Sequence, residues 1–340
     1  MMNLVKILTL SGCGLLALGA CCKKDHSAGG EDEKTPIGFH ALSEETVVKA
    51  ETSKPLSAYH QDFGVWGVAR KEGAEDYVLW EQNGLAPVRR NVTSGVYQPE
   101  SAAYWLAGYS YHFMALAPYQ TGASNLAVTK GASQPGQDQL SFTFDLASQY
   151  ADGNYNFDLM GAVAQATVQS PAIAHPSSQP LTFWHLLTKL QISVAFRDAA
   201  GNPTSGKLTQ IRFVTDTDVA YTVKSQADKQ LVVTCDAGVK HPYEILFKLQ
   251  NKPPVANLLV VPQPVSNFEL YLDFTLGTGD SAVAYQDFKV NLTAGGNPSV
   301  YGYNESYHWN ITIGPKAEIS FKAEVAPWID EKVGDDVEFV

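Results

Sequence analysis

The sequence has few cysteines, and they are poorly placed for a disulfide framework. Cys13, Cys21 and Cys22 lie in the first 22 residues, which leaves Cys235 as the single cysteine of the remaining chain. A single cysteine has no partner for a disulfide within the body of the chain. In addition, no group of cysteine and histidine residues has the spacing of a zinc site. A disulfide-stapled scaffold and a zinc module are therefore excluded as the basis of the fold.

The sequence also lacks an excess of positive charge and a hydrophobic run long enough for a membrane helix. Its formal net charge is −11, and it contains no basic stripe, so no nucleic-acid partner is expected. The apolar run at residues 7–20 spans 14 residues, whereas a bilayer-spanning helix needs roughly 20.

Catalytic motifs are missing too. The chain contains no GxSxG, phosphate-loop or GxGxxG pattern, and its eight histidines form no HxH or HExxH pair. Cys235 lies in an apolar strand pattern, which favours a buried thiol over a nucleophile. We therefore expect neither an enzyme nor a bound cofactor or metal.

The N-terminal segment has the pattern of a secretory signal at residues 1–20. Lys6 precedes the apolar run, and the small residues Gly19 and Ala20 precede Cys21. The stretch LGAC resembles the lipobox of bacterial lipoproteins, which implies cleavage before Cys21 and attachment of lipid to it. An ordinary secretory signal is the alternative. The charged, glycine-containing residues 21–36 indicate a flexible tether.

From residue 37 onward the chain has an all-β pattern. Short alternating or apolar runs are bounded by Gly, Pro, Asn or Asp, and no stretch of 12 residues has a helical period. Residues 182–190 fit either a strand or a helical turn. Without crossover helices to cover a sheet on both faces, antiparallel β-sandwiches are expected. The expected strands span residues 62–70, 109–118, 139–146, 189–198, 209–216, 229–236, 243–250, 267–276, 286–292, 307–314 and 318–328.

The length of 340 residues suits about two domains. The turn-rich residues 197–207 favour an N-terminal domain at 37–198 and a C-terminal domain at 199–340. The proline-rich residues 171–180 are an alternative boundary.

The first and last strand patterns each carry one apolar row. In the first, that row consists of Ile37, Phe39 and Ala41. In the last, it consists of Ile319, Phe321, Ala323 and Val325. Such a row can occupy a groove in another subunit, or it can face the core of its own domain as an edge strand.

Several segments together resemble the fimbrillin family of pilin-like surface lipoproteins. The matching stretches, in chain order, are LGAC, FGVWGVAR, YHFMALAP, FWHLLTKLQISV, YGYNESYHWNITIG and ISFKAEVAPWID. The resemblance implies two tandem transthyretin-like antiparallel β-sandwich domains and a lipid-anchored outer-membrane precursor at the cell surface. It also implies that a trypsin-like protease removes the first strand, and that the last strand of a neighbouring pilin subunit replaces it head to tail.

Applied to this chain, the removable strand would carry Ile37, Phe39 and Ala41, and the donor strand would be the last one. Lys49 is the better cleavage candidate, because Lys54 precedes Pro55. No arginine occurs between Cys21 and Arg70, so a strictly arginine-specific protease would find no suitable site. A chain that is not cut would be an anchor or tip subunit.

Aromatic side chains allow a second interpretation. Trp80 and Trp105 lie near expected turns, where indole rings can bind sugars, although core packing is their ordinary role. The alternative function is therefore a glycan-binding outer-membrane lipoprotein that does not polymerise. In either case a receptor or glycan on a host or bacterial surface is an expected partner.

Overall fold

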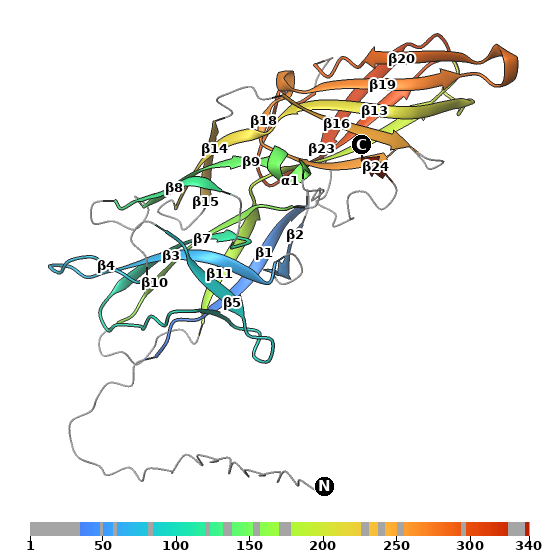
Figure 1. Ribbon diagram of the computed structural model, residues 1–340. Coiled ribbons are helices and arrows are strands. Elements are labelled where there is room, and N and C mark those ends of the chain that lie inside the picture. Colours follow the sequence, from blue (N-terminus) through green and yellow to red (C-terminus); the bar gives the residue numbers. More distant parts are fainter. Residues whose placement is uncertain are drawn as a thin grey trace, which may run out of the picture. The chain divides into compact units, whose positions relative to one another are not determined.

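The computed structural model describes most of the chain beyond residue 34. The described residues are 35–47, 50–56, 60–80, 84–119, 123–131, 138–151, 157–169, 178–225, 231–236, 242–249, 255–293, 297–325 and 337–339. Strands dominate them (Figure 1). The expected signal peptide lies outside these residues, and so does the expected tether except for Thr35 and Pro36, of which Pro36 forms an isolated bridge with Tyr104.

The first large sheet has nine strands in the order β11-β10-β7-β3-β5-β6-β1-β2, with β4 attached to β3. Its strands are β1 (Phe39–Val47), β2 (Ala50–Pro55), β3 (Asp62–Arg70), β4 (Tyr77–Val78), β5 (Ala86–Arg90), β6 (Tyr97–Pro99), β7 (Ser110–Ala117), β10 (Met160–Thr167) and β11 (Gln179–His185).

Strand β1 closes this sheet into a ring. It pairs in parallel with β11, from Phe39↔Gln179 to Ser43↔Phe183, and antiparallel with β6 at Phe39↔Tyr97. Because β11 and β6 are the two ends of the row β11-β10-β7-β3-β5-β6, the strand between them removes both free edges. The ring therefore depends on a strand that lies at the start of the described chain.

Three further sheets and a two-stranded ribbon complete the described structure. One sheet has the order β15-β14-β9-β8, with β8 (Ser124–Thr129), β9 (Gln139–Asp145), β14 (Asp218–Ser225) and β15 (Leu231–Asp236). A second has the order β17-β12-β22-β23, with β12 (Thr188–Phe196), β17 (Val255–Val260), β22 (Glu305–Ile313) and β23 (Ile319–Val325).

The third sheet has the order β20-β19-β13-β16-β24, and its strands lie side by side in Figure 1. They are β13 (Gly206–Asp216), β16 (Pro242–Leu249), β19 (Glu269–Leu276), β20 (Val283–Lys289) and β24 (Val337–Phe339). The ribbon pairs β18 (Gln263–Pro264) with β21 (Val300–Tyr301).

The all-β prediction is confirmed. Residues 182–190 form strand on both sides of a short connection, because β11 ends at His185 and β12 begins at Thr188. Two features differ from a purely antiparallel arrangement: β1 pairs in parallel with β11, and β12 pairs in parallel with β22. One short helix, α1 (Leu146–Ala151), follows β9. No helix of the described residues has both the length and the apolar composition to cross a membrane.

The described core consists of two clusters of buried side chains, and β3 contributes to both. Phe63 and Val65 belong to the cluster inside the ring, whereas Trp66 and Val68 belong to the larger cluster shared with the other sheets. Strands, and not helices, thus cover β3 on each face. A Cβ atom at Gly67 would lie only 2.8 Å from Leu79 Cδ1, so this close packing requires glycine.

Strand pairing crosses residue 198 in both directions. Strand β12, which precedes it, pairs with β17 and β22, which follow it. Strand β14, which follows it, pairs with β9. The division into domains at 37–198 and 199–340 stays a prediction.

Candidate assembly site

The inward row of the first strand is fully buried. The exposed fractions of Ile37, Phe39 and Ala41 are 2%, 0% and 3%, whereas His40 between them is exposed. Alternation along a strand explains this pattern, because successive side chains point to opposite faces. The Phe39 ring lies 5.3 Å from the ring of Phe113 and 5.8 Å from that of Phe63, in both cases edge to face.

Neighbouring segments hold β1 on both sides. The Ile37 N–H donates to the carbonyl of Ala103 at 2.8 Å, and the Gln179 N–H donates to the carbonyl of Gly38 at 2.7 Å. The β1-binding surface is defined here as the facing edges of β6 and β11 together with the rings that contact Phe39. Loss of β1 would expose apolar rings and unpaired backbone groups together.

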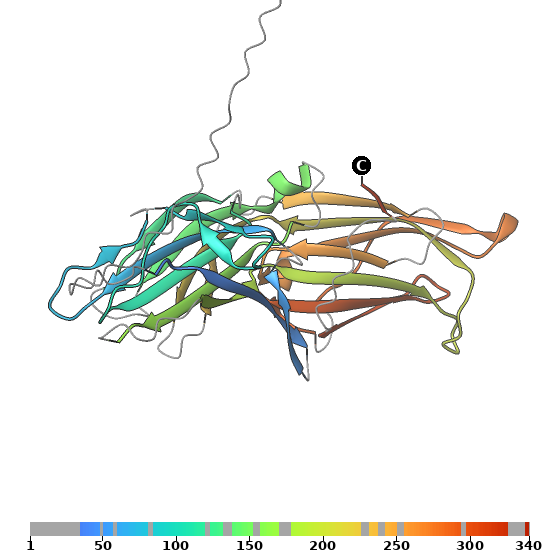
Figure 2. The same ribbon diagram turned by 90° about the horizontal axis from the view of Figure 1, so that it is seen from below.

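Beyond the ring, β1 continues into a hairpin with β2, paired from Leu42↔Pro55 to Val47↔Ala50. The far end of this hairpin extends away from the neighbouring strands (Figure 2). Lys54 lies in β2 opposite Ser43. Lys49, like Cys21, lies outside the described residues.

The last predicted strand, β23, pairs with β22 from Ile313↔Ile319 to Tyr307↔Val325. Ile319, Phe321 and Ala323 are partly buried against the larger core cluster, and the Phe321 ring lies 5.4 Å from the Trp309 ring. Among the described strands β22 is the one neighbour of β23. Asn297 Oδ1 accepts a hydrogen bond from the Ala323 N–H at 2.8 Å.

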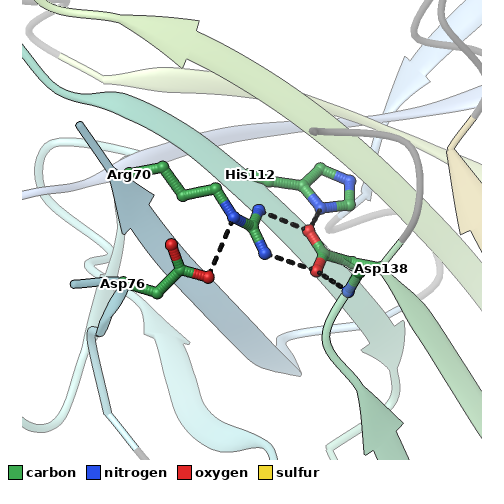
Figure 3. A network of polar contacts seen from close by, with 5 residues as sticks. Arg70, Asp76, His112 and Asp138 are labelled. Atoms are coloured by element: carbon green, nitrogen blue, oxygen red, sulfur yellow. Dashed lines mark hydrogen bonds and ion pairs between the residues drawn. The ribbon is translucent and has the colours of Figure 1, made fainter. Parts of the chain in front are cut away.

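A buried ionic network lies beside the ring (Figure 3). Asp138 is fully buried, and its two carboxylate oxygens accept hydrogen bonds from Arg70 Nη1 and Nη2, both at 2.7 Å. His112 Nδ1 lies 2.5 Å from Asp138 Oδ2. Burial alone would raise the pKa of Asp138, but the hydrogen bonds from His112 and Arg70 lower it to about 2.

The same network takes Arg70 out of solvent. Its Nε donates to Asp76 at 3.1 Å, and its side chain is only 8% exposed. The network joins β3, β7 and the segment before β9, so it holds these three parts of the chain together. A bidentate, buried guanidinium is also a poor substrate for a protease that must take an arginine side chain into its own pocket.

A second buried pair joins Asp158 to His185, whose Nδ1 lies 2.6 Å from the carboxylate. The Asp158 carbonyl accepts a hydrogen bond from His60 Nε2 at 2.7 Å, and Tyr97 donates to the His60 carbonyl at 3.2 Å. Burial lowers the pKa of His60. Among the described residues no group of three or more His, Cys, Asp or Glu side chains is arranged to hold a metal ion.

The two tryptophans singled out for glycan contact differ in exposure. Trp80 is half-buried, and its Nε1 donates to the Ser101 carbonyl at 2.9 Å. Trp105 is only 6% exposed and packs edge to face on Tyr111 at 4.7 Å. Little of the Trp105 ring is therefore available to a sugar, and glycan contact stays a prediction.

Comparison with known proteins decides the family. A family model described as fimbrillin-like matches residues 52–328, which is most of the chain. The chain belongs to the fimbrillin-like family. No curated protein matches it in sequence.

Several solved structures are similar to the chain, and one of them has a TM-score above 0.5. A fimbrial protein from Bacteroides vulgatus matches with a TM-score of 0.56 and 13% identity, over 86% of this chain and 99% of that one. A cell adhesion protein described as putative, from Bacteroides uniformis, has a TM-score of 0.48 and 17% identity, over 88% and 100% of the two chains. The fimbrial anchor protein Mfa2 from Porphyromonas gingivalis has a TM-score of 0.36 and 10% identity, over 86% and 98%.

Membership places the chain among fimbrillin-like proteins. Strands β1 and β23 are the two strands for which the sequence predicts a role in assembly.

Proposed function

We propose that this fimbrillin-like chain is a structural fimbrial subunit or accessory adhesin that assembles by strand exchange. In this proposal the chain is exported as a lipoprotein anchored through Cys21 in the outer membrane. Removal of the first strand then allows other fimbrial subunits to add head to tail. The single observation that supports it best is the position of β1, which closes the ring with a fully buried apolar row.

Strand exchange is physically favourable because the ring would be left open and partly exposed after β1 is removed. Edge backbone groups of β6 and β11 would lose partners, and the rings around Phe39 would meet water. An extended strand from another subunit restores both the main-chain hydrogen bonds and the side-chain packing. Because donor and acceptor are different surfaces of one chain, addition continues without closing and gives a filament.

Cleavage must fall between β1 and β3 to release the strand. Lys49 and Lys54 are the basic residues in that interval, and Pro55 disfavours a cut after Lys54. The ion pairs of Arg70 argue against cleavage there. We therefore propose Lys49 as the maturation site for a trypsin-like protease with lysine specificity. Without that cut the chain would serve as an anchor or tip.

The test is limited digestion of the folded precursor with a lysine-specific protease, followed by mass spectrometry and by gel electrophoresis of unheated and heated samples. The expected result is one early cut after Lys49 and a ladder of heat-resistant oligomers. Lys49→Ala should abolish both, whereas the matched control Lys54→Ala should behave like the parent. An intact N-terminal strand after prolonged digestion would contradict a polymerising role.

A further inference from the structure

The indole of Trp80 lies beside the phenylalanine that helps β1 to close the ring. The Trp80 ring centroid is 6.3 Å from that of Phe39 and 6.4 Å from that of Phe113, and the two phenylalanine centroids are 5.3 Å apart. Both phenylalanines are fully buried, whereas Trp80 is half-buried against the same cluster. The indole is therefore a direct neighbour of the space that Phe39 fills.

The indole already enters the ring at a point where β3 has no side chain. A Cβ atom on Gly67 would lie 2.9 Å from Trp80 Cζ3, so only glycine allows this approach. The main chain before Trp80 is fixed, because β4 pairs with β3 and the Leu79 N–H donates to the Gly67 carbonyl at 2.9 Å. A deeper position of the indole would thus require rotation of the side chain and no movement of β4.

The polar contact of Trp80 faces solvent and does not lock the ring. Its Nε1 donates to the Ser101 carbonyl at 2.9 Å in an exposed position. Because Cζ3 belongs to the six-membered ring and points inward, that ring can move further in while Nε1 stays at the rim with Ser101 or water. Trp105 also lies beside Phe113, at 6.1 Å, but it is only 6% exposed and has little surface left to bury.

An empty Phe39 position would be costly for the chain. It would be bordered by the rings of Phe63, Phe113 and Trp80, whose centroids lie 5.8, 5.3 and 6.3 Å from that of Phe39. Water is a poor substitute there, because aromatic carbon offers it no hydrogen bonds. The cost depends on how far the neighbours can collapse into the space. Of these three rings, Trp80 alone has exposed surface to bury by moving inward.

We propose that Trp80 is an internal plug for the β1-binding surface. When Phe39 is absent, the indole of the same chain rotates into its position and covers Phe63 and Phe113. While Phe39 is present, its ring blocks this rotation. The proposal rests on the proposed function for the step that removes β1, and it adds a protected state of the chain after that step. A strand that enters the surface must displace the indole, so the plug lowers its apparent affinity by the fraction of chains that are open.

The first test empties the Phe39 position in the uncut, full-length chain. Phe39→Ala and the milder Phe39→Val are labelled with 5-fluorotryptophan, and the Trp80 resonance is identified as the one that Trp80→Phe removes. A soluble paramagnetic agent then reports how exposed each of the six tryptophans is. Relaxation of the Trp80 signal by this agent should fall about twofold in both variants, while that of Trp105 stays low. Unchanged or greater exposure of Trp80 in either folded variant contradicts the plug.

The second test measures access to the vacated surface. The full-length chain, with a specific protease site in place of Val48 and Lys49, is cut and the released fragment is removed. Binding of a labelled synthetic peptide of residues 35–47, which is the removed strand itself, is then followed in time. Trp80→Ala should take up the peptide with an association rate constant about tenfold higher than that of the parent. The matched control Trp105→Phe should behave like the parent.

The two rate constants separate the plug from the ordinary contact between Trp80 and Phe39. Loss of that contact raises the dissociation rate constant, whereas loss of the plug raises the association rate constant. Equal association rate constants for the parent and Trp80→Ala would overturn the plug. A fragment that never leaves the cut chain would instead reject the strand-release step of the proposed function, and the uncut variants would still decide whether Trp80 fills the Phe39 position.

Discussion

Strands β1 and β23 show how one residue pattern gives two different structural states. Each has Ile, Phe and Ala at alternate inward positions, with Ile37 just before β1, yet β1 has a neighbour on each side and β23 has β22 alone among the described strands. The pattern determines which side chains turn inward. The number of neighbours determines how completely they are buried. The same apolar pattern can therefore serve as a closing strand in one place and as an edge strand in another.

The largest expected effect is a difference in stability between variants that remove the phenylalanine of each strand. Phe39→Ala should lower the free energy of unfolding by about 3–5 kcal/mol, because Phe39 is fully buried among aromatic rings. Phe321→Ala should cost about 1–2 kcal/mol, because Phe321 is only partly buried. Urea unfolding of the uncut protein measures both. Equal losses would show that the two strands are equally anchored.

A second prediction concerns the buried carboxylate that supports the ring. Asp138→Asn should destabilise the protein by about 3 kcal/mol, since Arg70 and His112 would lose their charged partner inside the structure. Thermal or urea unfolding measures the loss. The matched control on β23 is Glu324→Gln, which changes an exposed carboxylate and should leave stability unchanged within error.

The pH dependence of Asp138 has a defined sign. Its folded pKa of about 2 lies below the ordinary value of 3.8, so the unfolded chain binds the proton more readily. The stabilisation is thus complete above pH 3.8 and is lost as the pH falls toward 2. The Asn variant should lack this acid-dependent part of the unfolding curve. A parallel pH profile of parent and variant would contradict the role of the carboxylate.

A smaller fall in pH, to just below 6.5, should loosen β1 before it loosens β23. Burial holds the pKa of His60 below its ordinary 6.5, so the neutral ring is favoured in the folded state. Stability should therefore be full above pH 6.5 and decline as the pH falls below it, until the folded pKa is passed. Because Tyr97 joins His60 to the β6 edge, amide exchange in β1 should rise before that in β23.

The control for this experiment is the exposed His40 of β1 itself. His60→Gln should flatten the pH dependence of unfolding below pH 6.5, whereas His40→Gln should preserve it. If the free energy of unfolding of the His60 variant changes with pH as steeply as that of the parent, a group other than His60 causes the pH dependence.

Local pattern predicted the individual strands better than their arrangement. Residues 62–70 coincide with β3 (Asp62–Arg70), because an apolar run bounded by turn residues is a strong local signal. The polar residues after Leu42 gave no such signal, yet they form the rest of β1, because β2 supplies the pairing. The ring closure could not be predicted, since the β1–β11 pairing joins segments far apart in the sequence.

The polar interior was missed for the same reason. His112 and Asp138 are 26 residues apart, and their contact depends on how β7 meets the segment before β9. From the sequence alone, a lone histidine in the aromatic run YSYHFMALAP is best explained as a half-buried, satisfied imidazole. The structure buries it almost completely and gives it a carboxylate. A charged or ionisable residue in a strand with both faces apolar is the local signal that could have pointed to such a partner.

The smallest expected effect concerns the edge of β23. Asn297→Ala removes the acceptor of the Ala323 N–H and should cost about 1 kcal/mol, as for one partly buried hydrogen bond. Hydrogen exchange should show faster exchange at Ala323 and unchanged exchange in β1. Asn297→Asp keeps an oxygen acceptor and should retain most of the protection. Faster exchange in both strands would mean that they open together, whereas an effect confined to β23 would make this strand the one that is free to leave its sheet.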